Sequence, residues 1–244
     1  MQLNKRSGNL DDCTGVASIG KTSCDRRLKM GQTHDRFPSS IFGYWGVTRS
    51  LEIVRDNETG IKVIGDLRTH PDRFDAWLNS NGVARFSNNR YPIPEATGES
   101  SYSFGDSKEF YSLEFAYITK DFPDLEQPDA SLATEALLKA GTAEKAIQIM
   151  EKELPEKSKH LFGPLKSGTF SCANAFTSPK LKHLESIPKG FNRQKRAEML
   201  LKRREWGDTY SPFTLGRITT PYLFKVLRDR NDLEPDLSYE DDTR

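Results

Sequence analysis

Two runs of apolar, aromatic and β-branched residues lie on either side of a turn-forming cluster. Residues 41–54 (IFGYWGVTRSLEIV) and 61–67 (IKVIGDL) have the composition of strands, and residues 56–60 (DNETG) between them end in glycine. Strand-forming runs separated by a short polar turn predict a β-hairpin. The chain therefore begins its folded part with antiparallel strands.

The same region predicts further strands and one short helix. A Pro at the first helical position and apolar residues at Phe74, Trp77 and Leu78 predict a helix over 70–81. Residues 83–86 and 110–118 read as strands, with a long polar loop over 87–107. We therefore expect a small antiparallel sheet with one short helix over about 41–119, inside a β-rich domain at 39–125.

The C-terminal half predicts helices. Residues 131–140 and 142–154 form a helical pair within 126–155, separated at Gly141, with Thr142 as a cap of the second helix. Residues 191–206 and 219–230 predict two more helices, the last with Thr220 as its cap and Pro221 at its first position. The fold class is α+β. The remaining segments are an arm at 1–38, a basic loop with helices at 156–230 and an acidic tail at 231–244, the arm being flexible or ordered by a partner.

Composition narrows the class of protein further. No apolar run approaches the roughly 18–20 residues of a membrane helix, so no membrane partner is expected. The chain has only three cysteines, which is too few and too odd a number for a disulfide scaffold. A cytoplasmic, reducing location follows as an expectation.

Charge is strongly segregated along a chain whose formal net charge is only +1. Residues 51–155 hold 11 Lys and Arg against 19 Asp and Glu, whereas residues 156–230 hold 16 against 6. The last 14 residues hold 1 against 6. A segment with ten excess positive charges in 75 residues indicates an anionic partner.

Nucleic acid is the anionic partner that this pattern favours. Basic residues in a Pro/Gly-rich loop alternate with Phe162, Phe170 and Phe176, which suits phosphate contacts combined with base stacking. The basic helix offers a second surface. The sequence does not distinguish RNA from DNA, and an acidic protein surface is the alternative partner. The candidate contact residues are Lys166, Lys180, Lys182, Lys189, Arg193, Lys195, Arg196, Lys202, Arg203 and Arg204.

One string near the N-terminus matches the phosphate-binding P-loop pattern. It runs from Gly15 to Thr22 (GVASIGKT), with Gly20 and Lys21 at the remaining fixed positions. A P-loop must leave a buried strand and enter a helix, and the residues before Gly15 do not suit a buried parallel strand. We therefore interpret the string as a chance match in the arm and predict no bound cofactor.

Two metal-site hypotheses are weaker still. Asp66, Glu114 and Lys120 could form an Mg²⁺-dependent nuclease site if their strands were neighbours. Cys13, Cys24 and His34 are candidate zinc ligands, but their spacing differs from the closely paired ligands of structural zinc sites, and no fourth ligand is identified. We expect no metal at either set.

The sequence is most consistent with a non-enzymatic nucleic-acid-binding component of a larger nucleoprotein assembly, such as a viral, phage or mobile-element protein. Its partners would be RNA or DNA together with other protein subunits. The alternatives are an enzyme, either a P-loop NTPase or an Mg-dependent nuclease, and an adaptor that binds protein alone. Removing the acidic residues 232–244 should tighten non-specific binding at low salt, because the tail competes for the basic helix.

Overall fold

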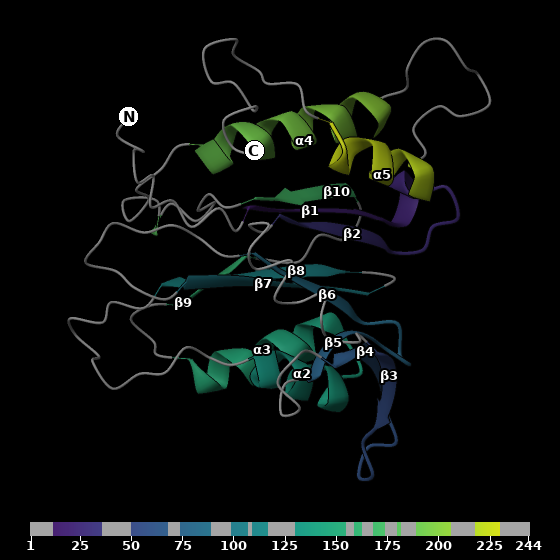
Figure 1. The fold of residues 1–244 in the computed structure, drawn as a ribbon, viewed down its shortest axis with the longest axis vertical. Coiled ribbons are helices and arrows are strands. Elements are labelled where there is room, and N and C mark those ends of the chain that lie inside the picture. Colours follow the sequence, from purple (N-terminus) through teal and green to yellow (C-terminus); the bar gives the residue numbers. More distant parts are fainter. Residues whose placement is uncertain are drawn as a thin grey trace, which may run out of the picture.

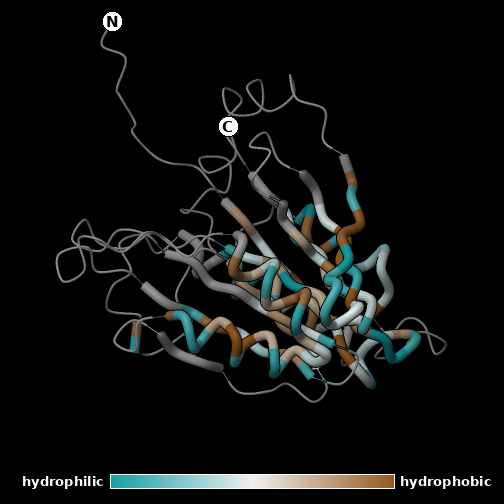
Figure 2. Tube along the Cα trace, turned by 90° about the horizontal axis from the view of Figure 1, so that it is seen from below, coloured by the Kyte–Doolittle hydropathy of each residue, from teal (hydrophilic) through white to brown (hydrophobic). Residues whose placement is uncertain are grey.

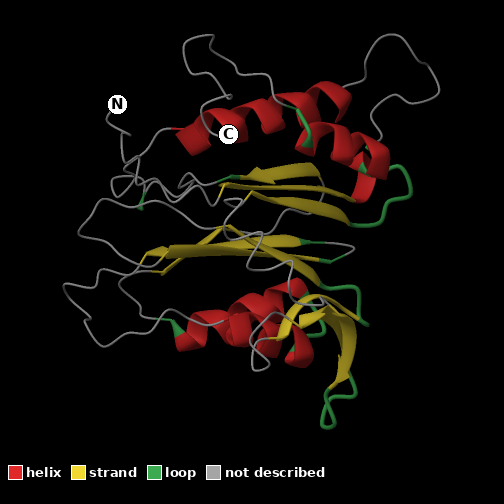
Figure 3. Ribbon diagram, in the orientation of Figure 1, coloured by secondary structure: helices red, strands yellow, loops and turns green. Residues whose placement is uncertain are grey.

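A computed structural model gives the structure of the chain, and it describes residues 12–35, 50–67, 74–88, 99–106, 109–116, 130–154, 159–162, 168–173, 180–181, 189–205 and 218–229. Two antiparallel sheets lie face to face, and a layer of helices covers the outer face of each (Figures 1 and 3). This arrangement confirms the α+β class, and it has two sheets where the sequence predicts one.

The smaller sheet has the order β10-β1-β2, from β1 (Asp12–Ile19), β2 (Lys29–Asp35) and β10 (Gly168–Cys172). The central strand, β1, pairs with β2 and β10 along its length. The prediction of a flexible or partner-ordered arm is therefore wrong for residues 12–35, which are ordered by pairing with the chain's own C-terminal half. The segment at 156–230, predicted as a basic loop with helices, also contains two strands, β9 and β10.

The larger sheet has seven strands in sequence order, all paired antiparallel. The predicted hairpin is confirmed as β3 and β4, and the predicted strands at 83–86 and 110–118 are confirmed as β6 and β8. The strands are β3 (Ser50–Arg55), β4 (Lys62–Leu67), β5 (Phe74–Asn79), β6 (Ala84–Asn88), β7 (Glu99–Gly105), β8 (Phe110–Ala116) and β9 (Lys159–Phe162).

The predicted helix at 70–81 is wrong, because residues 74–79 form strand β5 between β4 and β6. The pairing of β5 with β4 shifts register between Ile64 and Gly65, so that Trp77 is the extra residue on β5. Asn79 holds the strand end in place. Its buried Nδ2 donates to the carbonyls of Leu137 (2.9 Å) and Ala140 (2.8 Å), at the end of the neighbouring helix.

Helices α2 (Ala130–Lys139) and α3 (Ala143–Glu153) cover the outer face of the larger sheet and confirm the predicted helical pair. The Thr142 side chain accepts a hydrogen bond from the Lys145 N–H, which confirms the predicted cap. Apolar and polar segments alternate along the helices, as expected for helices with one buried face (Figure 2). Ile147, Met150 and Leu137 pack onto the sheet.

A second core lies between the two sheets. Phe86 and Phe110 from the larger sheet meet Phe170 from β10, with ring centroids 4.4 Å apart for Phe110 and Phe170. Ala17 and Ile19 of β1 point into the same core. Gly15 completes the fit, since a Cβ there would lie 2.4 Å from Cε2 of Phe86.

In the part of the chain that the structure describes, no helix combines the length and apolar character needed to cross a membrane.

Candidate nucleic-acid interface

Helices α4 (Lys189–Glu205) and α5 (Thr220–Leu227) form the outer layer on the smaller sheet (Figure 1). Both predicted helices are confirmed, but the α5 cap is Thr219 and not Thr220. The Thr219 hydroxyl accepts a hydrogen bond from the Tyr222 N–H (3.3 Å), and Pro221 follows in the first turn. Their buried side chains share a core with β1: Val16, Ala197, Leu201, Ile218, Leu223 and Val226.

Two polar contacts join the helices to each other. The Tyr222 hydroxyl donates to the Leu200 carbonyl (2.8 Å), and Arg196 Nε lies 2.7 Å from Asp229 Oδ2. The partner positions rise along α4 as they fall along α5, so the two helices run antiparallel. This pairing fixes which side chains face outward.

Four of the eight exposed residues on the described part of this surface are cationic, and none is anionic. We call this surface the α4–α5 face. Over 193–202 and 219–229 the chain holds six Lys and Arg against two carboxylates. The exposed residues of the α4–α5 face are Lys195, Met199 and Lys202 on α4, Thr220, Pro221, Phe224 and Lys225 on α5, and Arg228 directly after α5.

The predicted contact residues do not all lie on this face. Lys195 and Lys202 are exposed there, and Lys180 is exposed in a turn between β10 and α4. Arg193 is buried, with 5 % of its surface exposed, and Arg196 is paired with Asp229. Buried or paired guanidinium groups do not present a charge to phosphate.

The other predicted contacts have no described side chains. Lys189, Arg203 and Arg204 belong to α4, but the structure describes only their backbone. Lys166 and Lys182 lie outside the described residues.

Sequence reasoning missed Lys225, Arg228 and Phe224. The available signal was the spacing of Leu223 and Val226 on one side of α5, which leaves 221, 224, 225 and 228 on the other. Sequence reasoning also assigned base stacking to Phe170, but this side chain packs in the inter-sheet core. Phe162 and Phe176 have no described side chains.

The P-loop string lies in a different structural context. Gly15 to Ile19 form part of β1, paired on both edges, and Gly20–Thr22 is a single 3₁₀ turn. The Thr22 hydroxyl is buried and lies 2.7 Å from the Gly168 carbonyl, 3.0 Å from the Ile19 carbonyl and 2.9 Å from the Ser18 hydroxyl. It is occupied by the protein's own groups.

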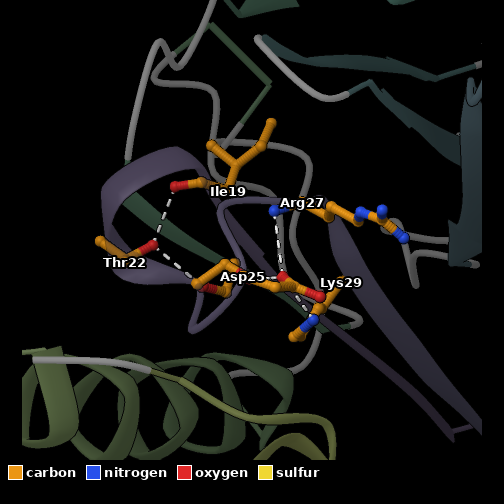
Figure 4. A network of polar contacts seen from close by, with 7 residues as sticks. Ile19, Thr22, Asp25, Arg27 and Lys29 are labelled. Atoms are coloured by element: carbon orange, nitrogen blue, oxygen red, sulfur yellow. Dashed lines mark hydrogen bonds and ion pairs between the residues drawn. The ribbon is translucent and has the colours of Figure 1, made fainter.

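No helix follows this string, which a P-loop requires. Asp25 forms a turn instead, accepting from the Arg27 N–H (3.0 Å) and from Lys29 Nζ (2.7 Å) (Figure 4). The hydrogen bond from Lys29 contributes most to holding the pKa of Asp25 well below its usual range. The backbone here closes a turn and does not wrap a phosphate.

The proposed nuclease carboxylates are on distant strands. Asp66 is on β4 and Glu114 on β8, with three strands between them. Four interstrand steps of about 4.8 Å separate them by roughly 19 Å, too far to share one metal ion. Lys120 lies outside the described residues.

The candidate zinc ligands are brought only partly together. Cys13 on β1 is buried and His34 occupies the position directly opposite on β2, while Cys24 follows the 3₁₀ turn. Among the described residues, no three His, Cys, Asp or Glu side chains gather as a metal site. No protein-family model matches the chain, and no curated protein sequence is significantly similar to it.

Proposed function

We propose that the protein is a non-enzymatic nucleic-acid-binding component of a larger nucleoprotein assembly, and that it contacts phosphates through the α4–α5 face. The observation that carries the proposal is that Lys195, Lys202, Lys225 and Arg228 are all exposed on the same pair of helices. Cations outnumber carboxylates six to two over 193–202 and 219–229, and one of the two carboxylates, Asp229, pairs with Arg196. Clustered cations of this kind bind phosphate backbones by releasing counterions.

The opposite helical layer lacks this bias. Residues 132–154 of α2 and α3 contain three Lys and four Glu. Lys139 there forms an ion pair with Glu135, 2.5 Å apart. Of the two helical layers that the structure describes, the one on the smaller sheet is therefore the more favourable for a polyanion.

The expectation of protein partners and an intracellular location belongs to the same proposal. On β3, the outermost strand in the described part of the larger sheet, Leu51 is 68 % and Ile53 is 69 % exposed. Such an apolar strand edge supports contact with another subunit. The three cysteines are thiols, which suits a cytoplasmic, reducing environment.

The test is a salt titration of oligonucleotide binding by fluorescence anisotropy. A variant with Gln at 195, 202, 225 and 228 should bind weakly, and its slope of log affinity against log salt should fall by about 3. The matched control replaces Arg55, Lys62, Lys145 and Lys152, which are exposed elsewhere. Equal binding by the two variants, or no binding by the wild type, would reject the proposal.

A further inference from the structure

Phe224 is the one exposed aromatic side chain among the described residues of the α4–α5 face, with 54 % of its surface exposed. Its neighbours Leu223 and Val226 are buried against β1 and α4. The Thr219 cap and Pro221 fix the residue at which α5 begins. Because Leu223 and Val226 lie on the buried side of this helix, Phe224 is exposed to solvent. The ring is therefore available to a ligand.

Cations lie close to this ring along the helix. Arg228 follows Phe224 by four residues, one turn away on the same side, and Lys225 is adjacent. An aromatic surface beside two cations offers stacking for a base and charge for the phosphates on either side of it. A nucleic acid with unstacked bases can use both the ring and the cations, whereas one with stacked bases can use only the cations.

The packing of α4 and α5 prevents the two helices from entering a duplex groove together. Helices in contact have axes about 8–10 Å apart and are each about 10 Å in diameter, so the pair is roughly 18–20 Å wide. The major groove of B-form DNA is about 12 Å wide and admits one helix. Both helices also lie flat on the smaller sheet, as Figure 1 shows. A duplex could contact the cations of this face with its phosphates, but its bases are stacked on one another and have no free face for Phe224.

We infer that the α4–α5 face binds single-stranded nucleic acid, with a base stacked on Phe224 and neighbouring phosphates held by Lys225 and Arg228. This inference rests on the proposed function of the face. It adds the form of the ligand and the residue that selects it. Stacking tolerates any base, so binding should depend little on sequence.

The experiment compares one labelled oligonucleotide as a single strand and as a duplex, at equal salt, with the full-length protein. Phe224→Leu keeps an apolar side chain without a π face, and Phe224→Trp keeps the stacking surface. Met199→Leu is the control for an exposed apolar residue on α4. Both positions are exposed and all three replacements are apolar, and thermal unfolding confirms that each variant is folded.

We expect the wild type to prefer the single strand. Phe224→Leu should weaken single-strand binding at least about five-fold and leave duplex binding unchanged, while Phe224→Trp and Met199→Leu bind as the wild type. Equal loss for both forms, no loss, or a preference for the duplex would overturn the inference. The proposed function would still stand in those cases if the four-cation variant loses binding. If that variant binds normally, the proposed function itself fails.

Discussion

Arg196 on α4 and Asp229 just after α5 form an ion pair, with Nε and Oδ2 2.7 Å apart and both side chains largely buried. The pair fastens the last residues of the α5 region to α4. It also removes from the binding surface a cation that the sequence alone would assign to phosphate. Two adjacent basic residues of α4 therefore differ in role: Arg196 joins the helices, whereas Lys195 is exposed on the surface.

This separation predicts opposite effects for adjacent substitutions. Arg196→Gln should lower the free energy of unfolding by about 1 kcal/mol, because it leaves Asp229 without its charged partner, and should change nucleic-acid affinity little. Lys195→Gln should weaken binding and leave stability within about 0.5 kcal/mol of the wild type. Urea unfolding and anisotropy on the same preparations check both, and the reverse pattern would contradict the assigned roles.

Gly15 is required by the close approach of the two sheets. Gly15→Ala places a methyl group against the Phe86 ring, so we expect a loss of about 1–3 kcal/mol of stability from overpacking. Gly141→Ala is the control, because the nearest atom to a Cβ there is 3.9 Å away. The midpoint of urea unfolding should fall for the first variant only. Equal midpoints would mean that the sheets do not pack as described.

Thr22 and Lys21 should behave as structural and surface residues and not as parts of a nucleotide site. Thr22→Val removes a buried hydroxyl bonded to the Gly168 and Ile19 carbonyls and should cost about 1–3 kcal/mol of stability. Lys21→Ala, at an exposed position, should have little effect. Neither Mg-ATP nor Mg-GTP should raise the melting temperature of the wild type. A rise that Lys21→Ala abolishes would restore the P-loop interpretation.

The buried Tyr111 should make alkaline stability depend on pH. Its burial, together with a hydrogen bond to Glu109 Oε2 (2.6 Å), raises the pKa of Tyr111 above its ordinary value of 10.0. The folded state therefore favours the neutral phenol. This contribution is complete below about pH 10 and is lost as the pH rises through the higher pKa of the folded state. Wild-type stability should fall more steeply above about pH 10 than that of Tyr111→Phe, as measured by urea unfolding. Parallel profiles would contradict this.

The sequence predicted the elements whose stabilising contacts are local. The hairpin of β3 and β4, the cap at Thr142 and helices α2 to α5 depend on turn chemistry and on helical spacing. The prediction was wrong for β5, whose apolar spacing is typical of a helix. Strand pairing on both sides and the hydrogen bonds of Asn79 to the end of α2 determine its structure instead. Those contacts join residues about 60 positions apart, which no local pattern reports.

The prediction was wrong for β1 for a different reason. Both of its faces are buried, yet its small residues, Gly15, Ala17 and Ser18 among them, resemble a polar linker. Small side chains are needed where a sheet packs between another sheet and a helical layer, and composition does not show that context. The same limit applies to the candidate site, because charge counting cannot tell that Arg193 is buried and Lys225 exposed.

Lysine footprinting tests the location of the binding surface most directly. Folded protein is acetylated briefly with and without saturating single-stranded oligonucleotide, and the modified lysines are quantified by mass spectrometry. Binding at the α4–α5 face should protect Lys195, Lys202 and Lys225 and leave Lys145 and Lys152 on α3 as reactive as in the free protein. Uniform reactivity, or protection of the α3 lysines instead, would contradict the proposed interface.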